Sequence, residues 1–208
     1  MTISTYDELK AALGDWLERG DLAARAGDFI ALAEARMNRQ LRLAVMEAEA
    51  EIAAAAGERT LALPADFREA RGLWRVEPGG RAQLRYRPAS LLPHSDEGGA
   101  AEFWTLQGGE IVLERPCAAA SDFRLGYVRR LSLSAAAPSN AVLAAHPDVY
   151  LFGALAEAAP YLRDGEMTGQ FTARFEGAMA EAKAADAARH GLARLRTEAP
   201  LAAEGWPC

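Results

Sequence analysis

The spacing of apolar residues changes twice along this chain, and this change constrains the fold more than any other feature. From residue 5 to 42, apolar side chains recur every three or four residues, the period of a helix buried on one side. From about 43 to 134, short alternating stretches are separated by turn residues, which is typical of strands. The helical period returns near residue 146. The pattern therefore predicts helices at both ends with a β-rich insertion between them.

The N-terminal region, 5 to 42, is predicted to form two helices that pack as an antiparallel pair. Thr5 or Ser4 caps the first helix, which ends at Gly20, and Asp28 is the expected N-cap of the second. The second helix should run to about Arg42. Its expected buried stripe is Ile30, Ala33, Met37 and Leu41, and its expected wetter faces carry Glu34, Arg36, Asn38, Arg39 and Arg42.

The middle of the chain contains several strand-like stretches separated by turns. The clearest pair flanks Gly108-Gly109, a link that is able to adopt the positive φ angles of a tight hairpin. Five prolines punctuate the region and keep the predicted strands short. The predicted strands are 47 to 53, 59 to 63, 70 to 77, 82 to 86, 103 to 106, 111 to 113 and 122 to 131.

The C-terminal third is predicted to be helical again after a linker at 135 to 145. Pro147 suits the first position of a helix, and Pro160 should kink or end it. A last helix is expected at about 166 to 190, and the tail that follows should be mobile on its own. The last helix carries a stripe of Phe171, Phe175, Ala178, Met179 and Ala182.

Together these features predict an α+β fold: mainly an α-helical bundle with a small antiparallel β-rich insertion and an extended C-terminal tail. The expected divisions are a helical bundle from 1–42 and 135–190, a β-rich insertion from 43–134, and a flexible docking tail from 191–208.

Catalytic and metal-binding patterns are missing from the sequence. Neither a GxSxG nucleophile motif nor a phosphate-binding GxxxxGK[ST] loop occurs. The two cysteines and three histidines are scattered, so we expect no metal site and no cofactor. Glu47, Glu49 and Glu51 alternate along one predicted strand, and we interpret them as a solvated sheet face rather than as a catalytic pair. We therefore predict that the protein is not an enzyme.

Charge and hydropathy limit the partners. The formal net charge is −6, the opposite sign from that of most nucleic-acid-binding proteins. No apolar run approaches the roughly 18 residues needed to cross a bilayer, and the N-terminus does not resemble a signal peptide. We therefore expect no membrane association and a protein that stays in the compartment where it is made.

Basic residues cluster at two places despite the acidic total. One group on the second helix, Arg36, Arg39 and Arg42, is a candidate subunit interface; its alternative is ordinary solvation of a helix end. A second group enriches the C-terminal end, where Trp206 is a candidate interface anchor. The candidate docking residues there are Arg189, Leu192, Arg194, Leu195, Arg196 and Trp206, with Leu201 spaced among polar residues.

Four segments in this order resemble the head-to-tail adaptor (connector) proteins of tailed phages. They are YDELKAALGDWLERGDL, DFIALAEARMNRQLR, LPADFREAR followed by WTLQGGEIVL, and HPDVYLFGALAEAAPYLRD, followed by a long helix with aromatic residues. The resemblance covers residues 5 to 190 and brings no catalytic residues with it.

The resemblance implies a structural protein of the virion, made in the host bacterial cytoplasm. It implies a ring of twelve copies that binds the portal protein on one side and a tail, nozzle or stopper protein on the other. DNA would pass through the channel without specific binding, because acidic walls repel phosphates. The alternatives are a non-enzymatic cytoplasmic module that binds a ligand or peptide, and a hydrolase that uses the scattered carboxylates.

Overall fold

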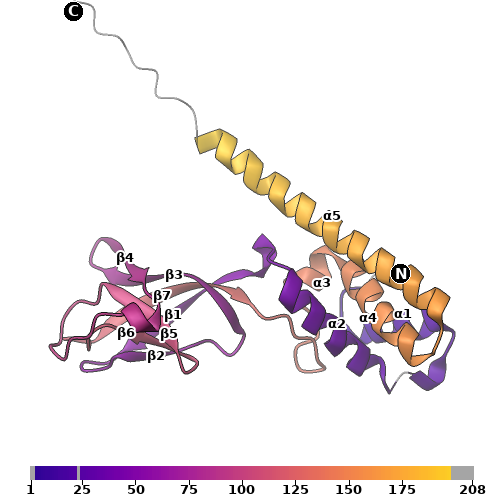
Figure 1. Cartoon of the computed structure of the whole chain (residues 1–208), viewed down its shortest axis with the longest axis horizontal. Helices are drawn as coiled ribbons and strands as arrows, with labels where there is room; N and C mark the ends of the chain where they lie inside the picture. Colours follow the sequence, from indigo (N-terminus) through magenta and orange to yellow (C-terminus); the bar gives the residue numbers. More distant parts are fainter. Residues whose placement is uncertain (1–2, 23, 198–208) are drawn as a thin grey trace, which may run out of the picture. The chain divides into compact units, whose positions relative to one another are not determined.

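The computed structural model describes residues 3–22 and 24–197 (Figure 1), with side chains up to Arg189. The chain forms two compact units. A helical unit comprises Met1–Val45 and Ser132–Cys208, and a β unit comprises Met46–Leu131. The chain therefore leaves the helical unit once, builds the β unit from one continuous segment, and returns.

The first two helices are α1 (Tyr6–Leu17) and α2 (Ala26–Gln40). The cap predicted at Thr5 is confirmed, because its hydroxyl accepts the Glu8 N–H at 3.3 Å while Glu8 accepts the Thr5 N–H at 3.0 Å. The N-cap predicted at Asp28 is wrong. The second helix begins at Ala26, two residues before Asp28. Asp28 lies in the first turn, where its negative charge interacts favourably with the positive end of the helix dipole.

The next two helices are α3 (Ala141–Ala145) and α4 (Pro147–Tyr161). The predicted linker thus contains a short helix, which the Asn140 side chain caps by accepting two backbone N–H groups, those of Val142 and Leu143. The start of α4 at Pro147 and its end just after Pro160 are confirmed. Nine residues of α4 are buried because α1, α2 and α5 all pack against it.

The last helix, α5 (Gly165–Thr197), meets α2 and α4 around Gly153. A Cβ at Gly153 would lie 2.9 Å from the Phe175 ring and 3.2 Å from the Ala33 Cβ, so only glycine permits this close approach. All five residues of the predicted stripe on α5 are buried. The helix continues to Thr197, seven residues past its predicted end, because Gly191 costs a helix only about 1 kcal/mol and does not terminate it.

The β unit is a seven-stranded sheet with the order β1-β7-β3-β4-β5-β6-β2. β4 pairs first with β3 and then, through Arg85 and Tyr86, in parallel with β5. The edge strands β1 and β2 touch each other, so the sheet curves back on itself. The strands are β1 (Glu47–Ala54), β2 (Thr60–Ala62), β3 (Phe67–Glu77), β4 (Gly80–Tyr86), β5 (Phe103–Gln107), β6 (Glu110–Leu113) and β7 (Ser121–Arg129).

The fold class predicted from the sequence is wrong on two points. The β part is not a small insertion in a mainly helical bundle but a curved sheet of seven strands with its own core. The sheet is also mixed rather than antiparallel, because β4 and β5 run parallel. Local turn residues predicted each strand and the Gly108-Gly109 hairpin, but they carry no information about strands joined by the long 87–102 connection.

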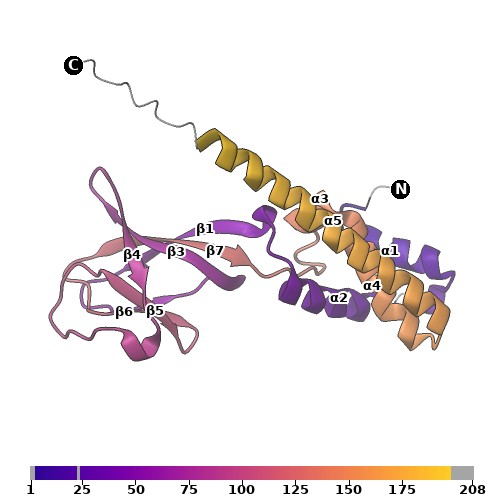
Figure 2. The same ribbon diagram turned by 45° about the horizontal axis from the view of Figure 1, so that its top comes forward.

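The interior of the β unit is mainly apolar. Leu73, Phe123 and Leu125 from the neighbouring strands β3 and β7, which lie side by side in Figure 2, are fully buried. Trp104 of β5 closes this core and donates its indole N–H to the Leu84 carbonyl at 3.3 Å. A buried carboxylate, Glu114, accepts the backbone N–H groups of Glu102 and Phe103 and so fixes the start of β5.

Candidate docking surfaces

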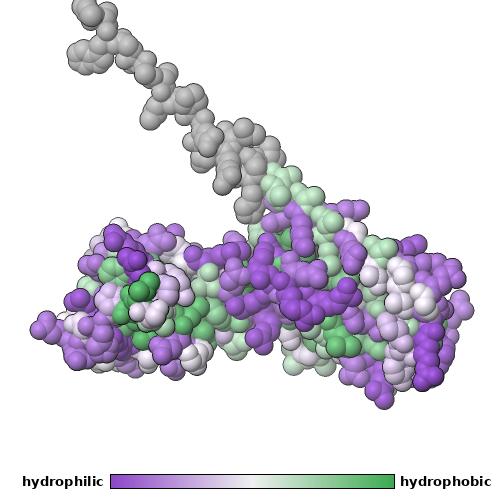
Figure 3. Space-filling model, in the orientation of Figure 1, coloured by the Kyte–Doolittle hydropathy of each residue, from purple (hydrophilic) through white to green (hydrophobic). Residues whose placement is uncertain are grey.

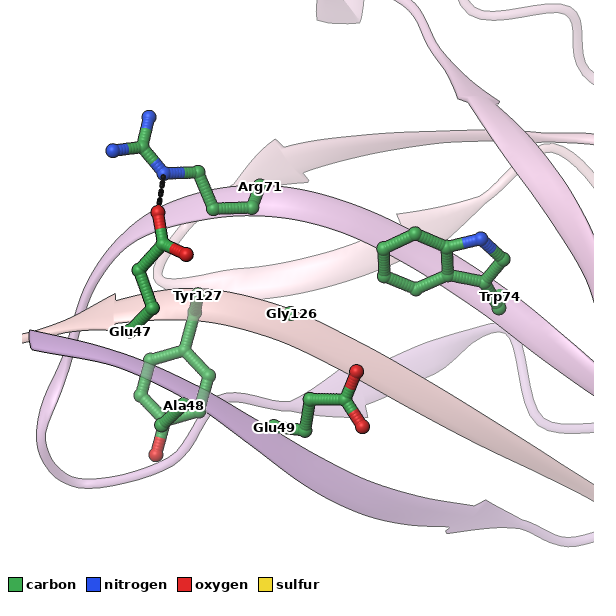
Figure 4. Close-up of a pocket in the computed structure, with 7 residues that line it drawn as sticks. All are labelled: Glu47, Ala48, Glu49, Arg71, Trp74, Gly126 and Tyr127. Atoms are coloured by element: carbon green, nitrogen blue, oxygen red, sulfur yellow. Dashed lines mark ion pairs between the residues drawn. The ribbon is translucent and has the colours of Figure 1, made fainter. Parts of the chain in front are cut away.

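A shallow groove of about 370 Å³ crosses the outer face of the sheet where β1, β7 and β3 lie side by side (Figure 4). Glu47 and Glu49 of β1 line it on one side, and Arg71 and Trp74 of β3 on the other. Ala48, Gly126 and Tyr127 complete the lining.

The Trp74 ring lies across two glycines of adjacent strands. A Cβ at Gly72 would be 2.7 Å from this ring, and one at Gly126 would be 3.1 Å from it. Arg81 of β4 stacks on the ring with its guanidinium carbon 4.9 Å from the centroid. The aromatic ring is therefore held flat against the sheet, with the glycines supplying the space.

Exposed ion pairs join the strands around this groove. Arg71 contacts Glu47 at 3.3 Å and Glu69 at 3.1 Å, and Arg124 contacts Glu51 at 2.8 Å. Glu49 lies 3.6 Å from both Arg81 and Arg124. The sequence interpretation of Glu47, Glu49 and Glu51 as a solvated face is confirmed, with the addition that arginines of other strands of the sheet pair with all three.

This arrangement is suited to recognition rather than to proton transfer. A catalytic acid needs a carboxyl group that burial holds protonated, whereas Glu47, Glu49 and Glu51 have exposed side chains beside arginines. A flat aromatic ring bordered by mixed charges instead offers a partner both an apolar contact and hydrogen-bonding groups.

A second groove, of about 420 Å³, lies where β4 leaves β3 to pair with β5. Its walls are mostly apolar: Trp104 and Leu106 of β5 and Tyr86 of β4, whose ring meets Trp104 edge-on at 5.2 Å. Residues 68 to 71 of β3 form the opposite wall. The β unit thus has two distinct surfaces that are able to hold a partner side chain.

The strongest perturbation of a titratable group lies in the helical unit, away from both grooves. Glu34, predicted to be solvated, is only 6% exposed and accepts the Tyr150 O–H at 2.9 Å. The Asn140 side-chain amide donates to the same Tyr150 oxygen at 2.6 Å. Burial raises the pKa of Glu34 and, with the adjacent carboxylate, also that of Tyr150. This cluster ties α2, α4 and the cap of α3 together, so its role is structural.

The three arginines predicted at a subunit interface have different surroundings. Arg36 is turned inward, where it contacts Glu157 of α4 at 3.0 Å and lies 5.0 Å from the Phe175 ring centroid. Arg42 donates to the carbonyls of Leu41 and Arg39. Arg39 is exposed on the outer face of α2. A contact between these arginines and a second copy of the chain stays a prediction.

The predicted docking tail is only partly within the described structure. Arg189 is exposed on α5, and between Lys183 and Arg189 no side chain of this helix is buried. Leu192, Arg194, Leu195 and Arg196 fall in the last turns of α5, whose side chains are not described. Leu201 and Trp206 lie outside the described residues.

Other chemistry is sparse in residues 3–22 and 24–197. No group of three metal-binding side chains comes together there, and the thiol of Cys117 is buried, which raises its pKa. In the same part of the chain, no helix combines the length and apolar character needed to cross a membrane. On the face shown in Figure 3, each unit carries many hydrophilic side chains and smaller hydrophobic areas.

These features define a two-unit protein that offers other proteins an exposed long helix and a grooved sheet. The family comparison agrees: the model of the SU10 adaptor protein family matches residues 4–198, and the chain belongs to this family. The predicted resemblance to phage head-to-tail adaptors is therefore confirmed. Membership indicates a structural, non-enzymatic component of the phage particle that interacts with other particle proteins. Among curated proteins, none matches the chain.

Sequence reasoning missed the groove around Trp74. Gly72 and Trp74 are two residues apart and face the same side of one strand, which the alternation of a strand predicts. Gly126 comes more than fifty residues later, and only the pairing of Gly72 with Gly126 brings the second glycine under the ring.

Proposed function

We propose that the chain is a head-to-tail adaptor whose copies, twelve in number, form a ring between the portal protein and a tail, nozzle or stopper protein. The observation that carries this proposal is the family match over residues 4–198, nearly the whole chain. Assembly would take the protein from the host cytoplasm into the virion. In the ring, it lines a channel through which DNA passes without specific binding.

The long helix supports the assignment of the portal contact. Beyond Ala182, α5 buries no further side chain up to Arg189, although it continues to Thr197. A helix that extends past its own core presents unsatisfied surface to a partner. The residues that follow it, with Trp206 among them, supply an aromatic anchor of the kind enriched at interfaces. We therefore assign portal docking to Arg189, Leu192, Arg194, Leu195, Arg196 and Trp206.

The charge of the chain supports a channel that does not retain DNA. A net charge of −6 on each copy adds up in a ring, and like charges repel the phosphate backbone. A ring whose bore is lined by basic side chains would contradict this part of the proposal.

Deletion of residues 190–208 tests the portal contact. The deletion removes no side chain of the described core, so the shortened chain should keep its melting temperature, and its circular dichroism spectrum should lose only the helical signal of residues 190–197. Binding to the immobilised cognate portal should be lost. A control chain with Leu91→Ala, which removes an apolar side chain that is 65% exposed in the β unit, should bind like the wild type. Portal binding by the deleted chain at wild-type affinity would refute the assignment.

A further inference from the structure

The helical unit exposes three large apolar side chains; Tyr161 lies against Phe29 and Arg25, and the other two lie in settings of different charge. Trp16 on α1 is 45% exposed and Leu32 on α2 is 52% exposed. Exposed large apolar residues that lie beside unpaired charges are typical anchors of protein interfaces. We define the Trp16 site as Trp16 with its neighbour Asp15, and the Leu32 site as Leu32 with Arg39.

The Trp16 ring is fixed on one side and open on the other. It meets Phe152 of α4 edge-on at 5.8 Å and Phe171 of α5 at 6.3 Å, so its orientation is set before any partner arrives. Asp15 is exposed beside it, and within residues 3–22 and 24–197 its carboxylate has no hydrogen bond or ion pair. Arg174 of α5 is engaged with the Phe152 ring at 5.5 Å.

The Leu32 site has the complementary charge. Leu32 and Arg39 are seven residues apart on α2, so both lie on the helix face directed away from the buried stripe of Ile30, Ala33 and Met37. In the described part of the chain, the Arg39 guanidinium makes no hydrogen bond or ion pair. Asp28 on the same face is 3.8 Å from Arg25, which leaves Arg39 as the unpaired charge.

The two sites lie on different faces of the helical unit. Trp16 sits where α1, α4 and α5 meet, whereas the Leu32 site faces away from α4 on the far side of α2. A patch that pairs with a different patch on an identical copy makes a head-to-tail contact, and such contacts build a ring when the rotation between copies closes. A self-complementary patch would instead give a twofold dimer.

We infer that the Trp16 site of one copy docks against the Leu32 site of the next, with Asp15 facing Arg39 across the contact. This inference rests on the proposed ring and names the surface that builds it. Of the three arginines predicted at the interface, Arg39 would contact the next copy, whereas Arg36 contacts Glu157 and Phe175 inside its own subunit.

Charge reversal tests the pairing with the full chain and the cognate portal. Asp15→Arg alone, or Arg39→Asp alone, places like charges opposite each other at every contact and should abolish the ring seen by negative-stain microscopy. A mixture of the two variants should restore it, because alternating copies present only opposite charges and a ring of twelve accommodates alternation. The double variant should also form rings.

Matched controls separate charge from folding. Asp7→Arg makes the same charge change on the same helix, at a carboxylate whose side chain is 83% exposed, and should leave the ring intact. Trp16→Ala should reduce assembly of the twelve-membered ring at least tenfold without changing the circular dichroism spectrum, because the Trp16 side chain is nearly half exposed.

The outcomes distinguish this inference from the proposed function. Rings formed by both single reversals would overturn the inference while leaving the adaptor assignment standing. Loss of the ring in the single variants without rescue in the mixture would also overturn it, and would assign these residues to the portal contact instead. Absence of a ring with the wild-type chain would overturn the proposed function itself.

Discussion

The two units of this chain satisfy their buried carboxylates in different ways. The helical unit buries a carboxylate, Glu34, and satisfies it with Tyr150, so that charge is part of its internal architecture. The β unit also buries one carboxylate, Glu114, but satisfies it with two backbone N–H groups, and it places Glu47, Glu49 and Glu51 beside arginines on an open outer face. Buried and exposed carboxylates should therefore differ in their effect on stability, and substitutions should separate the two kinds.

The largest expected effect comes from the meeting point of three helices. Phe175→Ala removes a fully buried ring that contacts Gly153 of α4 and lies beneath Arg36 of α2. A buried phenylalanine replaced by alanine typically costs about 3–5 kcal/mol, which would remove much of the stability of the helical unit. Urea denaturation monitored by circular dichroism measures this loss in the free energy of unfolding. A loss below about 1 kcal/mol would contradict the described packing.

A smaller effect is expected where Trp74 lies on the sheet. Gly72→Ala places a Cβ into the tryptophan ring and should shift the ring off the sheet, at a cost of about 1–3 kcal/mol. Because Trp74 lines the groove, its fluorescence should change as well. Gly80→Ala is the matched control, since no atom lies within 4 Å of its added Cβ. Equal stability and equal fluorescence of the Gly72→Ala and Gly80→Ala variants would show that the Trp74 ring does not lie on Gly72.

The buried carboxylate should make the stability of the helical unit depend on pH. Burial raises the pKa of Glu34 above its ordinary 4.5, so the folded state favours the protonated form. The contribution of the Glu34 carboxyl group to the free energy of unfolding is fully present below pH 4.5. It is lost as the pH rises through the pKa that Glu34 has in the folded state. The Glu34→Gln variant should therefore gain stability relative to the wild type as the pH rises from 4 to 8. Denaturation curves at several pH values test this, and a constant difference would contradict the raised pKa.

The smallest effect is expected on the outer face of the sheet. Glu49→Gln removes a carboxylate 3.6 Å from both Arg81 and Arg124, but exposed ion pairs contribute only about 0–1 kcal/mol. Its melting temperature should stay close to that of the wild type and should lose part of its dependence on salt concentration. A loss above about 2 kcal/mol would place this carboxylate in the internal architecture, as Glu34 is in the other unit.

The sequence predicted local structure well because local structure depends on neighbouring residues. The stripe of Ile30, Ala33 and Met37 and the hairpin at Gly108-Gly109 follow from helical spacing and turn chemistry. The parallel pairing of β4 with β5 and the contact between the sheet edges depend on residues far apart in the chain.

The burial of a single polar residue also could not be predicted from the pattern of its neighbours in the sequence. The spacing of α2 places Glu34 beside the core, but its solvation was predicted from its charge. Its burial is tolerable because the Tyr150 hydroxyl and the Leu133 backbone, both distant in the chain, hydrogen-bond to it. Local spacing likewise gives no sign that Trp16 is exposed. Its spacing matches that of the buried Leu9 and Leu13, yet the ring lies at the end of α1, where the core is open on one side.

The central claim is that copies of this chain assemble on a portal. Microscopy of the cognate portal mixed with the full chain, with the symmetry of the added layer counted in class averages, tests it most directly. We expect an extra ring of twelve subunits on the portal's tail-facing end. A bare portal beside solitary copies of the chain, at concentrations well above those in an assembling cell, would contradict it.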